Sequence, residues 1–252
     1  MMSIATVKQP LGGKRFPLSR SARPPVKNRL IEALPRQDRK HLLARCERVE
    51  LDFAEVLFEP EQRIRYVFFP AGSFISLIAP TDADANFEVG LVGDEGMLGL
   101  PLLLGIKEAP LRALVQGSGA AWRMRATPFC RELEESVSLR RLLNRYLHVT
   151  LRQLTQTALC NHFHGVDARL ARWLLTTADR AHSDHFNITQ EFISSMLCVR
   201  RAGVNRAAAL LRERKLIRYS RGRLTILDRR GLQAVACACY AAARKSYAKI
   251  LG

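Results

Sequence analysis

A stretch of the chain without helix-breaking residues places the strongest limit on its fold. The segment from Cys130 to Cys160 contains neither glycine nor proline, and roughly thirty helical residues would span about 45 Å. A helix of that length suits a connecting rod better than the core of a compact domain. We therefore expect a long helix, at residues 130–162, to divide the chain into two parts.

Two apolar stripes run along this predicted helix. One has the 4-3-4 spacing of a coiled-coil seam and consists of Leu143, Leu147, Thr150 and Leu154. The other lies on a different face and consists of Leu139, Leu142, Tyr146 and Val149. We predict that the first stripe is a dimer interface and that the second packs on the chain's own N-terminal domain. The alternative is one helix buried within a single core.

Short strands are predicted before the helix. A helical segment at 27–48 precedes β-type runs at 49–53, 56–58, 66–69, 74–78, 87–92 and 111–115. Turn residues separate these runs, among them Gly93-Asp94-Glu95-Gly96. Many short strands at regular spacing predict a sandwich or barrel, and we assign residues 26–129 to this domain.

The last third of the chain predicts two helices and a hairpin. We expect Thr189 to cap a short helix at 190–197. A turn at Cys198-Val199 leads to a second helix at 201–214, and two β-type runs, 216–219 and 224–227, follow it. This order is typical of a winged helix-turn-helix, which we assign to residues 163–252.

The second helix of that pair carries side chains suited to reading DNA. Arginine can pair bidentately with guanine and asparagine with adenine, while the first helix and the wing contact phosphates. The predicted DNA-binding residues are Thr189, Gln190, Arg200, Arg201, Asn205, Arg206, Arg221 and Arg223. The alternative is an ordinary amphipathic helix with a solvated arginine face.

The distribution of charge agrees with a polyanionic partner. The chain has a formal net charge of +17, which indicates nucleic acid or an anionic membrane surface unless the protein is merely basic. Residues 1–31 carry +7, residues 32–160 carry −1, and residues 161–252 carry +11. Charge confined to the two ends favours a DNA-binding domain joined to a sensor. We interpret residues 1–25 as a disordered basic arm.

The remaining features favour a cytoplasmic protein without a metal centre. No run of about 18 apolar residues predicts a membrane span, and no secretory signal is evident. Cys46, Cys130, Cys160, Cys198, Cys237 and Cys239 have no disulfide-framework spacing. Two cysteines such as Cys237 and Cys239 cannot close a tetrahedral zinc site, although Cys160 and His164 offer further ligand types. We predict no metal site.

Several motifs resemble the Crp/Fnr family of bacterial transcription regulators. In the C-terminal part they are Arg169-Leu170-Ala171-Arg172-Trp173-Leu174-Leu175, Ile188-Thr189-Gln190-Glu191 and Val199-Arg200-Arg201. In the β-rich part they are Tyr66-Val67-Phe68-Phe69-Pro70 and Gly93-Asp94-Glu95-Gly96-Met97-Leu98-Gly99. The resemblance covers residues 27–240. It implies an α+β fold: a cyclic-nucleotide-binding-like β-roll, a long dimerisation helix and a winged helix-turn-helix.

The resemblance also implies an effector pocket in the β-roll. Family members that bind cyclic AMP use a Gly-Glu segment and a later arginine; the matching residues here are Glu88, Gly93, Glu95, Gly96 and Arg112. Leu111 falls where the arginine belongs, and neighbouring strand residues face opposite ways, so Arg112 is expected to point outward. A phosphate without its cation is a poor ligand. The resemblance thus admits a cyclic nucleotide, but we predict no cofactor.

The sequence therefore predicts a homodimeric transcription regulator that binds a palindromic DNA site without cyclic AMP, with RNA polymerase as a further partner implied by the resemblance. The alternative is a ligand-binding regulatory module that acts on a protein partner. An enzyme is not expected. The sequence has no paired carboxylates with a base, no glycine-rich phosphate loop, and no His-Glu-x-x-His spacing.

Overall fold

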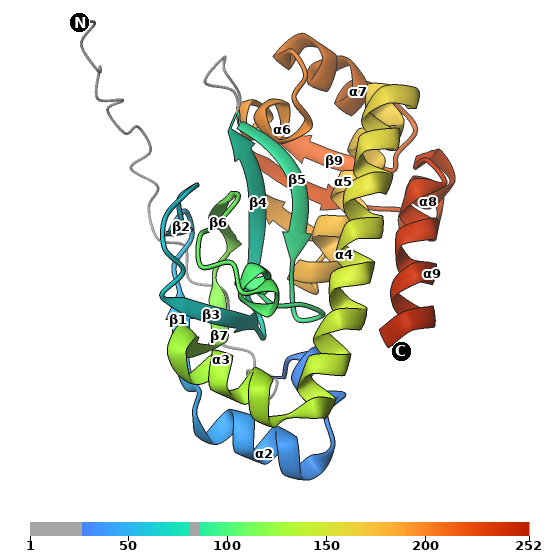
Figure 1. Ribbon diagram of the computed structural model, residues 1–252. Coiled ribbons are helices and arrows are strands. Elements are labelled where there is room, and N and C mark those ends of the chain that lie inside the picture. The colour runs from blue at the N-terminus through green and yellow to red at the C-terminus, as the bar shows by residue number, and fades with distance from the viewer. Residues whose placement is uncertain (1–26, 81–85, 252) are drawn as a thin grey trace, which may run out of the picture.

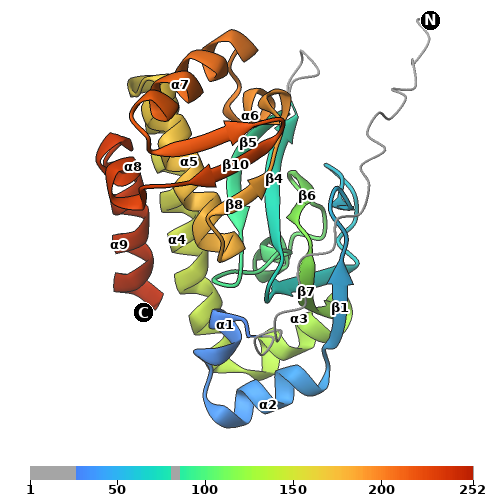
Figure 2. The same ribbon diagram turned by 180° about the vertical axis from the view of Figure 1, so that it is seen from behind.

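The computed structural model describes residues 27–80 and 86–251, and the basic arm predicted at 1–25 lies outside them. The chain forms a β-rich N-terminal half and a mainly helical C-terminal half, joined by one long helix (Figures 1 and 2). Each half has its own cluster of buried apolar side chains. The α+β architecture expected from the sequence is confirmed.

Two antiparallel sheets form the N-terminal half, behind the short helices α1 (Arg29–Glu32) and α2 (Arg36–Ala44). The larger sheet has the strand order β2-β6-β4-β5, with bounds Val56–Phe58, Arg112–Gly117, Phe74–Pro80 and Asn86–Val92. The smaller sheet has the order β1-β7-β3, with bounds Glu47–Leu51, Gly119–Arg125 and Tyr66–Pro70. A 3-10 helix, η1 (Leu100–Leu104), lies between β5 and β6.

The predicted long helix is interrupted near its start. The chain forms α3 (Ala126–Glu135) and then α4 (Val137–Phe163). Ser136 separates them because its backbone is extended, at φ −100° and ψ 104°, and its side chain accepts a hydrogen bond from the Leu139 N–H. A serine in this role satisfies an N–H that has no partner within the helix. Residues 130–162 are therefore parts of two helices.

The N-terminal half of α4 packs on the β-rich domain as predicted for one of its stripes. Leu139, Leu142, Tyr146 and Val149 are all buried. Leu143 is fully buried as well, within the same apolar cluster. Its assignment to a dimer seam needs correction, because a side chain packed in its own protomer's core cannot also contact a partner.

The C-terminal half begins with α5 (Val166–Ala181) and contains the predicted pair of helices, α6 (Gln190–Leu197) and α7 (Arg201–Glu213). A three-stranded sheet has the order β8-β10-β9, with bounds His185–Asn187, Arg223–Ile226 and Ile217–Ser220. Helix α8 (Arg229–Val235) follows. None of the helices in the described ranges is both long and apolar enough to cross a bilayer.

The last helix, α9 (Cys239–Leu251), returns along α4 toward the N-terminal half (Figure 1). Leu251 packs against the apolar cluster of that half, and the Arg29 guanidinium lies 5.1 Å from the centre of the Tyr247 ring. The end of the chain thus contacts the β-rich domain although it follows the C-terminal one.

Candidate nucleic-acid interface

Helices α6 and α7 form a tight helix-turn-helix. The Thr189 side chain accepts a hydrogen bond from the Phe192 N–H at 3.1 Å, which confirms it as the N-cap of α6. Cys198 ends the helix in a left-handed conformation, at φ 50°. Its N–H donates to the Ser195 carbonyl oxygen at 3.1 Å. The chain then needs only Val199 and Arg200 before α7 begins.

Helix α7 separates an apolar face from a basic one. Val204, Ala207, Ala208 and Leu211 are buried in the C-terminal core. The exposed side chains at the start of the helix are Arg200, Arg201, Asn205 and Arg206. Burial of the apolar face fixes the helix, so that its first two turns present three guanidinium groups and one amide to solvent. This arrangement is the one required for contacts with base edges in a major groove.

The hairpin of β9 and β10 forms the wing. Its turn places Arg221 at φ 49° and Gly222 at φ 76°, the two consecutive positive values that a two-residue hairpin turn favours. The Ile188 N–H donates to the Gly222 carbonyl oxygen at 2.7 Å, and the Tyr219 hydroxyl donates to the Ile188 carbonyl oxygen at 2.9 Å. Both bonds hold the wing against the segment that leads into α6.

A hollow of 380 Å³ lies between the wing and the start of α6. Four of the predicted DNA-binding residues line it: Thr189, Gln190, Arg201 and Arg221. The fold therefore brings together residues that are up to 32 positions apart in the sequence. Arg223 is exposed on the neighbouring strand β10.

Sequence reasoning missed a residue that positions this site. Arg169 lies on α5, is 8% exposed, and donates through Nη2 to the Leu197 carbonyl oxygen at the end of α6. Burial lowers the pKa of this guanidinium. A cation at a helix C-terminus meets carbonyl groups that lack partners within the helix. The signal in the sequence is a charged residue on the otherwise apolar face of α5.

Glu88, one of the predicted effector residues, instead joins the two halves of the molecule. Its carboxylate accepts hydrogen bonds from the Ser76 hydroxyl at 2.7 Å and from the Trp173 indole N–H at 2.8 Å. Ser76 lies on β4, while Trp173 lies on α5. Burial raises the pKa of Glu88 to about 7, although both hydrogen bonds act in the opposite direction.

Glu95 also contacts the C-terminal half. Its carboxylate pairs with Arg180 at 2.7 Å, and the two side chains are 8% and 12% exposed. Gly93 lies directly beside this pair, where a β-carbon would collide with both Glu95 and Arg180. Gly96 packs against the Tyr146 ring in the same way. Both glycines are therefore required for close packing.

Arg112 does not join the other predicted effector residues. It pairs with Glu59 at 3.0 Å, and the side chains are 38% and 49% exposed. A separate cavity of 590 Å³ lies between the halves; Glu88, Glu95, Trp173, Arg180 and Tyr247 contribute to its walls, and Arg112 does not. The arginine thus faces solvent, as the strand register predicts.

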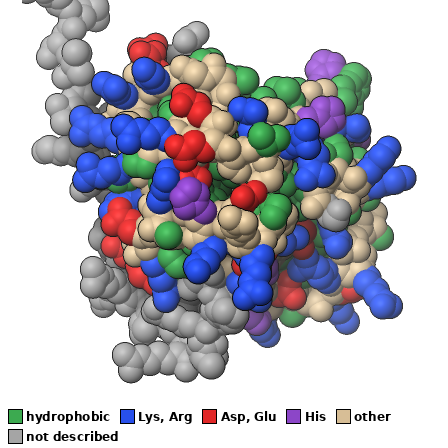
Figure 3. All heavy atoms as spheres, turned by 60° about the horizontal axis from the view of Figure 1, so that its bottom comes forward, with side chains coloured by type: hydrophobic (Ala, Val, Ile, Leu, Met, Phe, Trp, Pro, Cys, Tyr) green, Lys and Arg blue, Asp and Glu red, His purple; other side chains and the backbone are tan. Residues whose placement is uncertain are grey.

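The distribution of charge over the surface differs between the two halves. Figure 3, in which the end of the molecule bearing α2 is turned forward, shows acidic side chains among the lysines and arginines. Residues 161–252, which include the helix-turn-helix, carry 17 basic and 6 acidic side chains. Residues 161–252 are therefore strongly basic and can attract a polyanion.

The comparisons with known proteins agree with this geometry. Residues 168–235 match the model of the Crp-like helix-turn-helix domain. A search of curated proteins finds no sequence match.

Solved structures share the fold over most of this chain. A Crp/Fnr-family protein from Eubacterium rectale superposes with a TM-score of 0.66 at 15% identity, covering 82% of this chain and 96% of that one. FixK2 from Bradyrhizobium japonicum gives 0.65 at 14% identity, covering 77% and 98%. A Crp-family regulator from Thermus thermophilus gives 0.63 at 17% identity, covering 75% and 96%.

The family model covers the helix-turn-helix, and the solved structures match the fold that carries it. The chain therefore carries a Crp-like helix-turn-helix domain, a DNA-binding unit, on the fold of Crp/Fnr-family regulators.

Proposed function

We propose that the chain binds a palindromic DNA site as a homodimer, with one α7 helix in each of two successive major grooves. The observation that supports this proposal most directly is that the first turns of α7 expose basic side chains, while the apolar face of the helix is buried and fixes its position. Two such helices would read half-sites about 34 Å apart. RNA polymerase is the partner through which such a regulator acts, and the cytoplasm is the compartment in which it meets DNA.

Base recognition is assigned to α7 and phosphate contact to its surroundings. Arg201 and Asn205 are four residues apart and share one exposed face, so they are the candidates for base edges. Arg200 and Arg206 flank that face. Thr189, Gln190, Arg221 and Arg223 lie around the start of α6 and on the wing, where contacts with the DNA backbone would set the register.

The proposed dimer uses the C-terminal half of α4. Leu151 is 54% exposed, Leu159 is 46% exposed and Phe163 is 70% exposed, which is unusual for three large apolar residues on one helix. With Leu143 in the protomer's core, a 4-3 spacing runs instead through Leu147, Leu151 and Leu154. Thr150 is half-buried and borders that stripe.

The test is selection of binding sites from random DNA, followed by footprinting on the selected sequence. We expect a discrete, two-fold symmetric footprint. Arg201→Ala should weaken binding to that site by about 1–3 kcal/mol, because one base contact is lost, and should leave binding to random DNA nearly unchanged. Arg230→Ala, which removes an exposed arginine on α8, is the matched control.

Binding that is wholly independent of sequence would overturn this proposal and favour a module that acts on a protein partner. Equal affinities of Arg201→Ala and the unchanged protein for the selected site would remove Arg201 from base recognition.

We further infer that the chain does not use cyclic AMP. Arg112 is paired with Glu59 at the surface, and Glu88 and Glu95 are occupied by Trp173 and Arg180. A cyclic phosphate in the cavity would therefore meet these two carboxylates, and Arg112 is not among the residues that line it. Isothermal titration with cyclic AMP should show no binding, and a saturable signal that Arg112→Ala abolishes would contradict the inference.

A further inference from the structure

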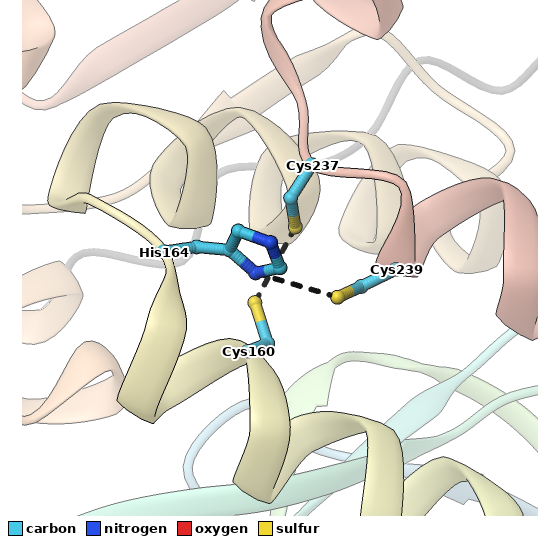
Figure 4. Close-up of side chains that lie close together, drawn as sticks. All are labelled: Cys160, His164, Cys237 and Cys239. Carbon is cyan, nitrogen blue, oxygen red and sulfur yellow. Dashed lines mark hydrogen bonds between the residues drawn. The ribbon is translucent and has the colours of Figure 1, made fainter.

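A cluster of four potential metal ligands lies outside the DNA-binding surface. Cys160, His164, Cys237 and Cys239 place their ligand atoms within 4.8 Å of one another, the only such cluster among the residues described (Figure 4). Cys160 comes from the last turn of α4, and Cys239 is the first residue of α9. Two segments more than 70 residues apart thus meet at one point.

Each segment has a local reason to present two ligands together. Phe163 is the last residue of α4, and the backbone of His164 is extended at φ −113° and ψ 141°. The His164 N–H still donates to the Cys160 carbonyl oxygen at 3.1 Å, so the imidazole stays beside the thiol one turn earlier. In the other segment a turn closes through a bond from the Tyr240 N–H to the Cys237 carbonyl oxygen at 3.1 Å.

The distances suit one tetrahedral ion. The Sγ atoms of Cys160 and Cys237 are 3.4 Å apart, and Cys239 Sγ lies 3.5 Å from His164 Nδ1. Bonds of about 2.3 Å to sulfur and about 2.0 Å to nitrogen place the ligands of tetrahedral zinc roughly 3.5–3.8 Å apart. A cluster of several iron atoms needs a wider spacing, because its ligands bind different irons.

The surroundings shield the ligand atoms from solvent. Cys160 is fully buried and Cys239 is 2% exposed, which keeps competing water away. The Gln156 side-chain amide donates to Cys239 Sγ at 3.0 Å, a supporting contact of the kind that orients metal ligands.

We propose that Cys160, His164, Cys237 and Cys239 bind one Zn²⁺ ion, through three thiolates and one imidazole. The sequence spacing alone predicts no metal site, because Cys237 and Cys239 supply only two ligands; the fold adds Cys160 and His164. All four positions are filled by protein side chains, which is the mark of a structural site rather than a catalytic one. The ion joins the end of α4 to the start of α9.

Metal content and Co²⁺ spectroscopy test the site without reference to DNA. The full-length chain, purified with reductant and without chelator, should contain one zinc per chain by mass spectrometry. After removal of the zinc, the chain should bind one Co²⁺ with the intense visible bands of tetrahedral thiolate coordination, and one Zn²⁺ should displace it.

Ligand variants decide which residues bind. Cys237→Ser and Cys239→Ser should each lower the affinity for Co²⁺ at least tenfold, whereas Cys130→Ala, which removes a half-buried cysteine of α3, should leave the affinity unchanged. His164→Cys should retain one metal ion and strengthen the sulfur-to-cobalt charge-transfer band, since it replaces one ligand by another. A stronger charge-transfer band cannot result from misfolding, so this variant tests the site even if the serine variants fail to fold.

Three results would overturn the assignment. The first is a reduced chain, with all six cysteines free, that shows no Co²⁺ bands. The second is a purified chain that holds iron and acid-labile sulfide in place of zinc. The third is a purified protein that contains a Cys160–Cys237 disulfide and that does not bind Zn²⁺ even after this disulfide has been reduced.

Discussion

Glu88 is a carboxylic acid buried between the two halves of the molecule, and burial raises its pKa to about 7. The Ser76 hydroxyl and the Trp173 indole N–H occupy one oxygen each, so either protonation state retains partners. An acid whose pKa is higher in the folded chain than in the unfolded chain favours folding at low pH. This residue therefore makes the stability of the folded chain dependent on pH.

We expect the free energy of unfolding to fall by roughly 3 kcal/mol, through this residue, as the pH rises from about 4.5 to about 7. In that range the unfolded chain loses the Glu88 proton while the folded chain keeps it. Denaturant titrations over this range should show the decrease in the unchanged protein and its absence in Glu88→Gln.

Glu134→Gln, at an exposed position on α3, is the control and should follow the unchanged protein. Parallel pH curves for Glu88→Gln and the unchanged protein would contradict the raised pKa.

Helix α4 leaves several large apolar side chains exposed to solvent. Its first half is buried by the β-rich domain, and α9 packs along it, yet Leu151, Leu159 and Phe163 remain exposed. A second copy of α4 would cover these side chains through the hydrophobic effect. The first part of α4 thus packs within its own protomer, and the second part, as proposed, packs against the partner in the dimer.

Leu151→Glu should convert the dimer to a monomer in sedimentation velocity experiments. In a two-fold symmetric seam the substitution places two carboxylates close together in a dry interface, and desolvation of each charge is costly. Arg131→Glu introduces the same residue at an exposed position on α3, away from α4, and should leave the dimer intact. A dimer that persists in Leu151→Glu would place the interface elsewhere.

The elements differ in how well their sequences predict them. Helix α6 was predicted with its observed bounds, because Thr189 is a cap and the next residues have helical spacing. Strand β7 was missed, since its buried positions include Ala120 and Ala121, which have low strand propensity. Its place between β1 and β3 comes from pairing with strands that are distant in sequence.

The candidate sites likewise could be predicted where their residues are close in sequence, and could not where the residues are distant. The basic face of α7 could be predicted because its residues lie within two helical turns. The partners of Glu88 and Glu95 could not, because Trp173 and Arg180 are 85 residues away from them. The Cys160–His164 and Cys237–Cys239 pairs were each visible in the sequence, but only the return of α9 along α4 brings them together.

At the scale of the whole molecule, polar contacts hold the DNA-binding half against the β-rich half. The chief contacts are Glu88 with Trp173, Glu95 with Arg180, Asp94 with His182 at 3.1 Å, and the Glu95 carbonyl oxygen with the Tyr247 hydroxyl at 2.5 Å. Ile78 of β4 also belongs to the apolar cluster of the DNA-binding half. Stability of the molecule therefore depends on contacts between its halves as well as within them.

Arg180→Met should lower the free energy of unfolding by about 3 kcal/mol, since it leaves the nearly buried Glu95 carboxylate without its cation. The double variant Glu95→Gln with Arg180→Met should recover much of that loss, because no buried charge remains. Chemical denaturation of all four members of the cycle measures the coupling. Additive effects of the two substitutions would mean that the pair contributes nothing of its own.

The DNA-binding half enters and leaves the rest of the molecule at a single place. The chain passes from α4 into α5 at His164 and returns into α9 at Cys237, and the ligand atoms of these two residues lie within 4.8 Å of each other. If α5–α8 rotated about this point, neither the link from α4 to α5 nor the link from α8 to α9 would have to lengthen. Swinging the domain therefore requires breaking side-chain contacts but no stretching of the polypeptide.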